Sequence, residues 1–208
     1  MTESDLTRHI AWDPGAAAVT RQVSDFLNAP AFLGAYSRLL IDLNRPLQAA
    51  TSIVTRSEDT DIPGNLHIDD AERQSRQDLI FTPYHNEVSG YLEQRQQSGL
   101  PVWLVSIHSF TPVYMGVSRP WHAGVLFDKA MHLGEALVAQ LRRPGVTVGA
   151  NVPYQTDRAE DYSVPIHGDD RGIPAVLIEI RNDLISDEAG IDNWARHLAV
   201  ALHAVTTV

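Results

Sequence analysis

Short apolar runs along this chain alternate with longer stretches in which apolar residues recur at helical spacing. The runs at residues 36–43, 101–110 and 175–180 predict strands, and a short further strand is expected at 146–150. The run at 101–110 is nearly continuous in apolar residues, which favours a strand buried on both faces. Such runs are typical of a largely parallel sheet.

Helical periodicity separates these runs. Apolar stripes predict helices at residues 15–27, 127–141 and 191–205. Residues 68–97 are polar and mostly helical, and Pro83 is expected to divide them into two helices. Strands that alternate with helices predict an α/β fold of three layers, in which a mixed, mainly parallel sheet lies between helices on both faces.

Composition narrows the classes of function. The chain has 208 residues, which suits one domain over 1–208, and its net charge of -10 argues against a nucleic-acid or anionic-membrane binder. It has no cysteine, so disulfides and thiolate chemistry are excluded. No apolar stretch has the roughly 20 residues of a membrane helix, and the N-terminus lacks a signal-peptide pattern. A cytoplasmic location is therefore expected.

Polar residues with usable chemistry stand at the ends of the predicted strands. His108, Glu179 and the pair Asn44-Arg45 each follow or end an apolar run. Ligands of open α/β sheets bind beyond the carboxyl ends of the strands, so these groups are expected to converge. Imidazole can bind a metal, a buried carboxylate with a raised pKa suits a general base, and guanidinium clamps an anion. The set predicts metal-assisted hydrolysis of an anionic substrate.

Each candidate also has a structural interpretation. His108 could be a hydrogen-bonded core histidine, and Glu179 could pair with Arg181, which shares its strand face. Asn44-Arg45 could fasten a loop. Asp13 could cap the helix at 15–27 or give an oxygen to a metal, to which His9 adds weight. Other polar candidates, each more typical of a loop or packing residue when judged alone, are Tyr84, His85, Arg119 and His167.

Eight ordered segments resemble the N-formylglutamate amidohydrolase family, in its predicted-amidohydrolase branch. They are RHIAWDPGA at 8–16, SRLLIDLNRP at 37–46, IPGN at 62–65, PYH at 83–85, SIHSFTP at 106–112, RPW at 119–121, NVPY at 151–154 and EIRNDL at 179–184. The resemblance implies a fold like that of zinc carboxypeptidases. It also implies hydrolysis of an N-formyl or N-acyl amino acid, which yields formate and glutamate in the named case.

The resemblance also implies roles for individual residues. Zn²⁺ is expected at His108, with Asp13 and His9 as further candidate ligands, and Glu179 is expected to activate the water. The substrate would be a small anionic N-acyl amino acid whose carboxylate Asn44 and Arg45 hold. A second anionic group or the oxyanion would meet Arg181 or Arg119, and Tyr84, His85 and His167 are further candidates for substrate binding.

One departure from the family leaves a second function open. Relatives usually begin with an additional strand that supplies an early metal-ligand histidine, whereas this sequence opens at about the 8–16 motif. Catalytic zinc usually has three protein ligands. The alternative is therefore a degenerate, non-catalytic protein that binds a small anion or an N-acyl amino acid. The sequence predicts no oligomeric state.

Overall fold

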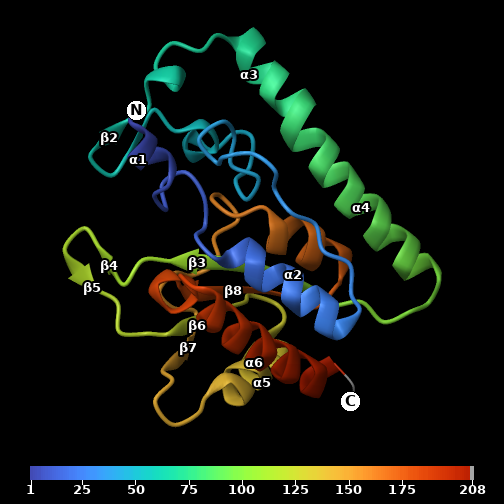
Figure 1. Ribbon diagram of the computed structural model, residues 1–208. Helices are drawn as coiled ribbons and strands as arrows, with labels where there is room; N and C mark the ends of the chain where they lie inside the picture. The colour runs from blue at the N-terminus through green and yellow to red at the C-terminus, as the bar shows by residue number, and fades with distance from the viewer. Residues whose placement is uncertain (207–208) are drawn as a thin grey trace.

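The computed structural model describes residues 1–206, and a four-stranded sheet lies at its centre (Figure 1). The strand order is β3 (Leu104–Phe110), β8 (Ala175–Arg181), β6 (Ala123–Leu126) and β7 (Val148–Ala150). β3 runs parallel to β8 and β6 runs parallel to β7, whereas β6 and β8 are antiparallel. The prediction of a mixed, mainly parallel sheet is confirmed.

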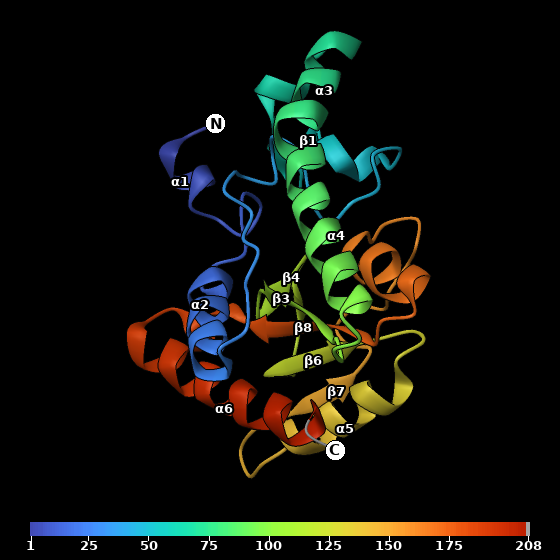
Figure 2. The same ribbon diagram turned by 90° about the vertical axis from the view of Figure 1, so that its right-hand side faces the viewer.

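One face of the sheet is closed by three helices, α2 (Ala16–Leu27), α5 (Met131–Leu141) and α6 (Glu188–Thr206), as Figures 1 and 2 show. The alternate positions of β6 and β8 that face these helices are apolar, which follows from the two-residue period of a strand. The main hydrophobic core forms there and includes Val125, Val176, Ile178, Ile180, Leu137 and Leu198.

The opposite face is covered only in part. The short π-helix η4 (Ser163–Gly168) packs on Leu126 and Leu177 through Val164. The long helix α4 (Thr82–Gln97) stands beyond it and packs near the start of β3. The carboxyl ends of β3 and β8 are thereby left next to irregular chain rather than under a helix.

Several elements differ from their prediction, first of all the strand expected at 36–43. Residues 36–43 form turns and irregular chain, and no strand includes them. Leu39 and Ile41 are buried as a strand would require, but they pack into two local clusters, and the Asp42 amide donates to the carbonyl of Ser52. The alternation of apolar and polar residues therefore reflects burial within loops. In the local sequence, such burial gives the same pattern as a strand.

Pro83 does not divide the helical region at 68–97. The helices α3 (Asp70–Arg76), η3 (Gln77–Phe81) and α4 follow one another without a gap. Pro83 lies in the first turn of α4, directly after the π-helical η3, where a missing N–H is tolerated.

The strand β3 is the edge of the sheet, so the expectation that it is buried on both faces is wrong: its first five residues are only partly buried. The strand β6 was not predicted. It is short and contains Gly124, which it needs because a Cβ there would collide with the carbonyl oxygen of Val152.

The remaining elements are short, and among the described helices none is long and apolar enough to cross a bilayer. They are α1 (Glu3–Leu6), η1 (Ala50–Ile53), β1 (Arg56–Ser57), β2 (Thr60–Asp61), η2 (Pro63–Asn65), β4 (Val113–Tyr114), β5 (Val117–Ser118), η5 (Asp169–Arg171) and η6 (Asn182–Ile185).

Candidate active site

His108 and Glu179 lie side by side on the two parallel strands. Their Cα atoms are partners in the register of β3 and β8, and Gly124 of β6 is the partner of Glu179 on its other side. Side chains of directly paired residues share a face, and Leu177, two residues before Glu179, faces η4. The imidazole and the carboxyl therefore stand together on the incompletely covered face.

Asp13 joins His108 from the segment before α2. The Nδ1 atom of His108 donates to Oδ2 of Asp13 at 2.7 Å, and Nε2 of His108 lies 3.0 Å from the hydroxyl of Ser106. Arg38 donates through Nη2 to the other oxygen of Asp13. The N-cap of α2 is Gly15, with no side-chain cap, so the carboxyl of Asp13 orients an imidazole rather than capping the helix.

The opposite charges of Asp13, His108 and Arg38 stabilise one another although these side chains are buried. Burial alone would raise the pKa of Asp13, but the charge of Arg38 and the hydrogen bond from His108 hold that pKa below its ordinary value. Burial would likewise lower the pKa of His108, and the hydrogen bond and charge of Asp13 outweigh it and raise that pKa. Each charge thus favours the other, the carboxylate form of Asp13 and the protonated form of His108.

Glu179 differs from Asp13 in that it has no such partner. It is 8% exposed, and among residues 1–206 no group hydrogen-bonds to its Oε2 atom. Burial raises its pKa to about 7, and the nearby charge of His108 offsets only part of that rise. A carboxyl that titrates near neutral pH can exist as a base and as an acid at the same site.

Arg119 and Tyr154 stand on the other side of Glu179. Nη1 of Arg119 donates to the hydroxyl of Tyr154 at 2.8 Å, and its guanidinium stacks over the rings of Tyr114 and Tyr154. Arg119 is 9% exposed and its charge acts on Glu179. Burial and the neighbouring Glu179 raise the pKa of Tyr154, so its hydroxyl keeps its proton.

Arg38 was not predicted as a site residue, although it lies inside the 37–46 motif. Its Nε atom is buried, and within the described chain it has no hydrogen-bond partner; Oδ2 of Asp42 is 3.8 Å away. The signal that could have found Arg38 was a basic residue directly before a buried run, four residues ahead of Asp42.

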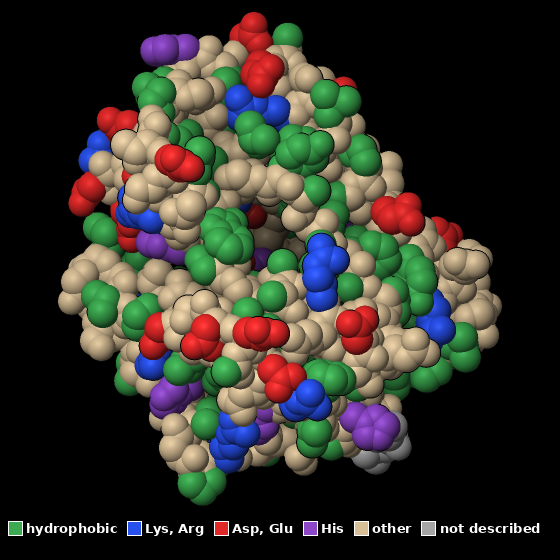
Figure 3. All heavy atoms as spheres, in the orientation of Figure 1, with side chains coloured by type: hydrophobic (Ala, Val, Ile, Leu, Met, Phe, Trp, Pro, Cys, Tyr) green, Lys and Arg blue, Asp and Glu red, His purple; other side chains and the backbone are tan. Residues whose placement is uncertain are grey.

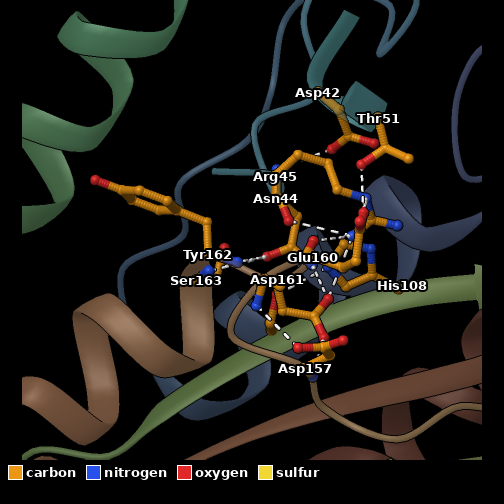
Figure 4. A network of polar contacts seen from close by, with 12 residues as sticks. Asp42, Asn44, Arg45, Thr51, His108, Asp157, Glu160, Asp161, Tyr162 and Ser163 are labelled. Atoms are coloured by element: carbon orange, nitrogen blue, oxygen red, sulfur yellow. Dashed lines mark hydrogen bonds and ion pairs between the residues drawn. The ribbon is translucent and has the colours of Figure 1, made fainter. Parts of the chain in front are cut away.

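Asn44 and Arg45 are turned toward the segment that leads into η4 (Figure 4). Nη1 of Arg45 donates to the carbonyl of Glu160 at 2.7 Å and to Oδ1 of Asp161 at 3.3 Å. The amide of Asn44 donates to the same Asp161 oxygen at 3.2 Å and accepts from the backbone N–H of Ser163 at 2.9 Å. We call Asn44, Arg45, Glu160 and Asp161 the loop clasp, because these contacts fasten two loops.

His85 and His167 form a buried pair behind this region. Nδ1 of His85 is 2.8 Å from Nε2 of His167, and Nε2 of His85 donates to the carbonyl of Leu43 at 2.9 Å. Burial lowers the pKa of both histidines to about 4, so both are neutral. Tyr84 and His167 line the cavity described next.

His9 and Arg181 are engaged elsewhere. Nε2 of His9 lies 3.2 Å from Glu58, and Arg181 forms an ion pair with Asp183 at 2.7 Å rather than with Glu179. The structure thus brings together Asp13, His108, Glu179 and Arg119 of the predicted set, and it adds Arg38.

A cavity of about 670 Å³ opens beside this group, and Figure 3 shows the hollow near the centre of that face. Its polar lining next to this group includes Asp13, Arg38, Asp42, Asn44, Ser106 and His108. Glu179 lies behind His108, one strand further into the sheet. Arg38 is the member of this group whose guanidinium can bind a small anionic ligand in the cavity.

The donor set does not complete a zinc site. No group of three or more His, Asp or Glu side chains within residues 1–206 is placed to hold a metal ion. Nδ1 of His108 and Oδ2 of Asp13 are hydrogen-bonded to each other, and His9 does not form a metal-binding group with them. Zinc at His108 stays a prediction, and the described residues alone do not fit a three-ligand centre.

Three comparisons bear on this site. A family model described as N-formylglutamate amidohydrolase matches residues 1–186. The crystal structure of gene product Atu2144 from Agrobacterium tumefaciens superposes with a TM-score of 0.92 at 36% identity, over 100% of this chain and 82% of that chain. That of N-formylglutamate amidohydrolase from Ralstonia eutropha JMP134 has a TM-score of 0.66 at 20% identity, over 93% and 81% of the chains, which indicates a shared fold. No protein with a curated description matches.

Proposed function

We propose that this chain, which belongs to the N-formylglutamate amidohydrolase family, hydrolyses the amide bond of a small anionic N-formyl or N-acyl amino acid. The observation that carries the proposal is Glu179, a buried carboxyl with an unpaired oxygen and a pKa near 7 beside a charged His108. Strongly shifted pKa values of this kind cluster at catalytic sites.

The proposed reaction uses Glu179 as a general base and then as a general acid. Its carboxylate takes a proton from a water molecule while the water oxygen attacks the acyl carbon. When the carbon–nitrogen bond breaks, the same proton passes to the leaving nitrogen, so the products are a carboxylic acid and a free amino acid. The pKa of Glu179 suits both steps near neutral pH.

The two guanidinium groups suit the charges of substrate and intermediate. Arg38 lines the cavity, and its Nε–H has no hydrogen-bond partner within residues 1–206, which favours it as the anchor for the substrate's α-carboxylate. Arg119 lies near Glu179 and is held in a cage of aromatic rings, so it is pre-oriented to stabilise the oxyanion. The imidazolium of His108 adds a second positive charge there.

The proposal is tested by incubating the purified protein with N-formyl-L-glutamate and N-acetyl-L-glutamate and measuring released formate, acetate and free amine. We expect turnover, and Glu179→Gln should lower kcat by about 10²–10⁴-fold because it removes the base. Glu135→Gln, at an exposed position of α5, is the matched control and should keep wild-type activity. The zinc content of the same preparation tests the predicted metal.

Two outcomes would contradict this assignment. If Glu179→Gln retains near-wild-type turnover, Glu179 is not the base. If calorimetry detects binding of N-acyl amino acids while no substrate is hydrolysed, the chain is a binding protein, an alternative that the incomplete donor set favours.

A further inference from the structure

The hairpin formed by β4 and β5 lies next to the active-site group, and it has no role in the proposed reaction. All of its residues, 113–118, are exposed, whereas Arg119, which follows directly, is buried. Figure 1 shows the hairpin beyond the carboxyl end of β3, at the outer edge of the molecule. A two-stranded hairpin has little stability of its own, so its position depends on the contacts at its base.

The register of the hairpin places Tyr114 over Arg119. Tyr114 pairs with Val117, and the backbone N–H of Arg119 donates to the carbonyl of Pro112 at 2.8 Å, which extends the ladder past β5. Arg119 follows Val117 by two residues, so its side chain lies on the same face as Tyr114. Diagonal neighbours of this kind are within reach of an aromatic ring and a long side chain. The guanidinium carbon of Arg119 is accordingly 4.6 Å from the centre of the Tyr114 ring.

The turn of the hairpin fixes this register. Its central residues Met115 and Gly116 have φ values of 50° and 78°, both in the left-handed region, as in a two-residue turn of type I′. A slip of one residue would carry Tyr114 to the opposite face, where Val113 and Ser118 now lie. The turn therefore determines which side chain of the hairpin covers the guanidinium.

Three rings from three elements surround the guanidinium of Arg119. The ring of Phe110, a buried residue at the end of β3, has its centre 5.9 Å from the guanidinium carbon. The Tyr154 ring lies at 4.9 Å, and its loop is fastened to β6 by a backbone hydrogen bond of 2.9 Å from Asn151. These two rings belong to the body of the protein, whereas the third, that of Tyr114, comes from the exposed hairpin.

The Tyr114 ring completes the enclosure of a buried cation. A guanidinium is attracted to the face of an aromatic ring, and the attraction is stronger where water is excluded. We propose that Tyr114 is a positioning residue, whose ring closes the cage around Arg119 and holds the guanidinium toward the acyl oxygen of the substrate. This inference rests on the proposed function, in which Arg119 stabilises the oxyanion. The ring makes the contact with Arg119, so the role is assigned to the ring and not to the hydroxyl.

The test compares three hairpin variants in the hydrolysis of N-formyl-L-glutamate and N-acetyl-L-glutamate. Tyr114→Ala removes the ring and should lower kcat by about five- to tenfold with KM within about twofold, because the guanidinium acts in the transition state. Tyr114→Phe keeps the ring and should retain kcat within about twofold of wild type. Val113→Ala changes the opposite face of the same hairpin and should keep wild-type kinetics.

A further pair of variants changes the turn and leaves the ring in the sequence. At φ 78° any residue with a side chain is strained, although the space around Gly116 is open. Gly116→Val should therefore displace Tyr114 and lower kcat as Tyr114→Ala does. Gly145→Val introduces the same strain at φ 80°, also in open space, in the turn that leads into β7, and should keep wild-type kcat.

The placement of Arg119 can be followed without turnover by ¹⁵N relaxation of its side-chain Nε–H group, assigned by the loss of its signal in Arg119→Lys. In Tyr114→Ala the order parameter of this group should fall below about 0.6, the range of flexible groups. Tyr114→Phe and Val113→Ala should keep the wild-type value.

An unchanged kcat or an unchanged order parameter in Tyr114→Ala would overturn the proposal. So would a Tyr114→Phe variant as slow as Tyr114→Ala, since the hydroxyl would then act. A rise in KM at constant kcat would also overturn it, since the ring would then bind the substrate. If the wild-type protein hydrolyses neither compound, the proposed function fails, and the order parameter still decides whether Tyr114 positions Arg119.

Discussion

The active-site group and the loop clasp are two polar clusters of similar composition with opposite properties. Both contain arginine and two acidic residues. In the loop clasp, however, Arg45 and Asn44 donate hydrogen bonds to Glu160 and Asp161. The active-site group leaves Oε2 of Glu179 and Nε of Arg38 unpaired although both atoms are buried. Buried polar groups are normally paired, so the unpaired ones mark where a ligand is expected.

The pH dependence of activity provides the largest expected effect. Because Glu179 has a pKa of about 7, raised by burial, its basic form increases as pH rises. We expect kcat/KM to rise about tenfold per pH unit well below 7, about 50-fold between pH 5 and 7, and about 100-fold from pH 5 to the plateau above pH 8. Initial rates measured across pH 5–9 check this.

If kcat/KM did not change over that pH range, no group of the active site would change its protonation state with an effect on the reaction. The distinction between the two clusters would then be lost. Stability measured in the same buffers is the control for loss of folded protein.

Matched arginine substitutions compare the clusters directly. Arg38→Lys keeps the charge but loses the planar fork, so we expect kcat/KM to fall by about tenfold or more with little change in stability. Arg45→Lys should leave kcat/KM within about twofold and lower the free energy of unfolding by about 1 kcal/mol, because it weakens the clasp. Steady-state kinetics and urea unfolding distinguish the two.

The reverse result, with Arg45→Lys raising KM strongly at unchanged stability, would restore the sequence-based interpretation of Arg45 as the carboxylate anchor.

The His85–His167 pair gives the smallest expected effect on activity, because it acts on stability. Burial lowers both pKa values to about 4, below the 6.5 of the unfolded chain, so unfolding takes up protons between these values. Stability is therefore full above pH 6.5 and declines as pH falls toward 4, by about 1.4 kcal/mol per pH unit for each proton. His85→Gln can still donate to Leu43 and should reduce this slope by about one proton.

Urea unfolding at pH 7, 6 and 5 measures the slope, and His132→Gln, at an exposed position of α5, is the control. An unchanged slope in His85→Gln would show that the pair does not sense pH.

The sequence predicted the parts of the molecule that depend on local pattern. The strands predicted at 101–110 and 175–180 brought His108 and Glu179 together as expected, because neighbouring parallel strands end at one edge. Loop fastening was one of two sequence-based interpretations of Arg45, but its partner Asp161 could not be predicted, since it is 116 residues away. β6 was not predicted because the small residues Ala123 and Gly124 do not produce a recognisable hydrophobic pattern.

Gly124 also limits how the candidate site of this protein can change. The carbonyl of Val152 occupies the space above Gly124, next to Glu179. Main chain, and not a side chain, therefore covers this position. Substituting Val152 would leave that oxygen in place. Side chains near Glu179, such as Arg38, Arg119 and Tyr154, can be substituted, whereas the main chain over Gly124 stays the same across variants.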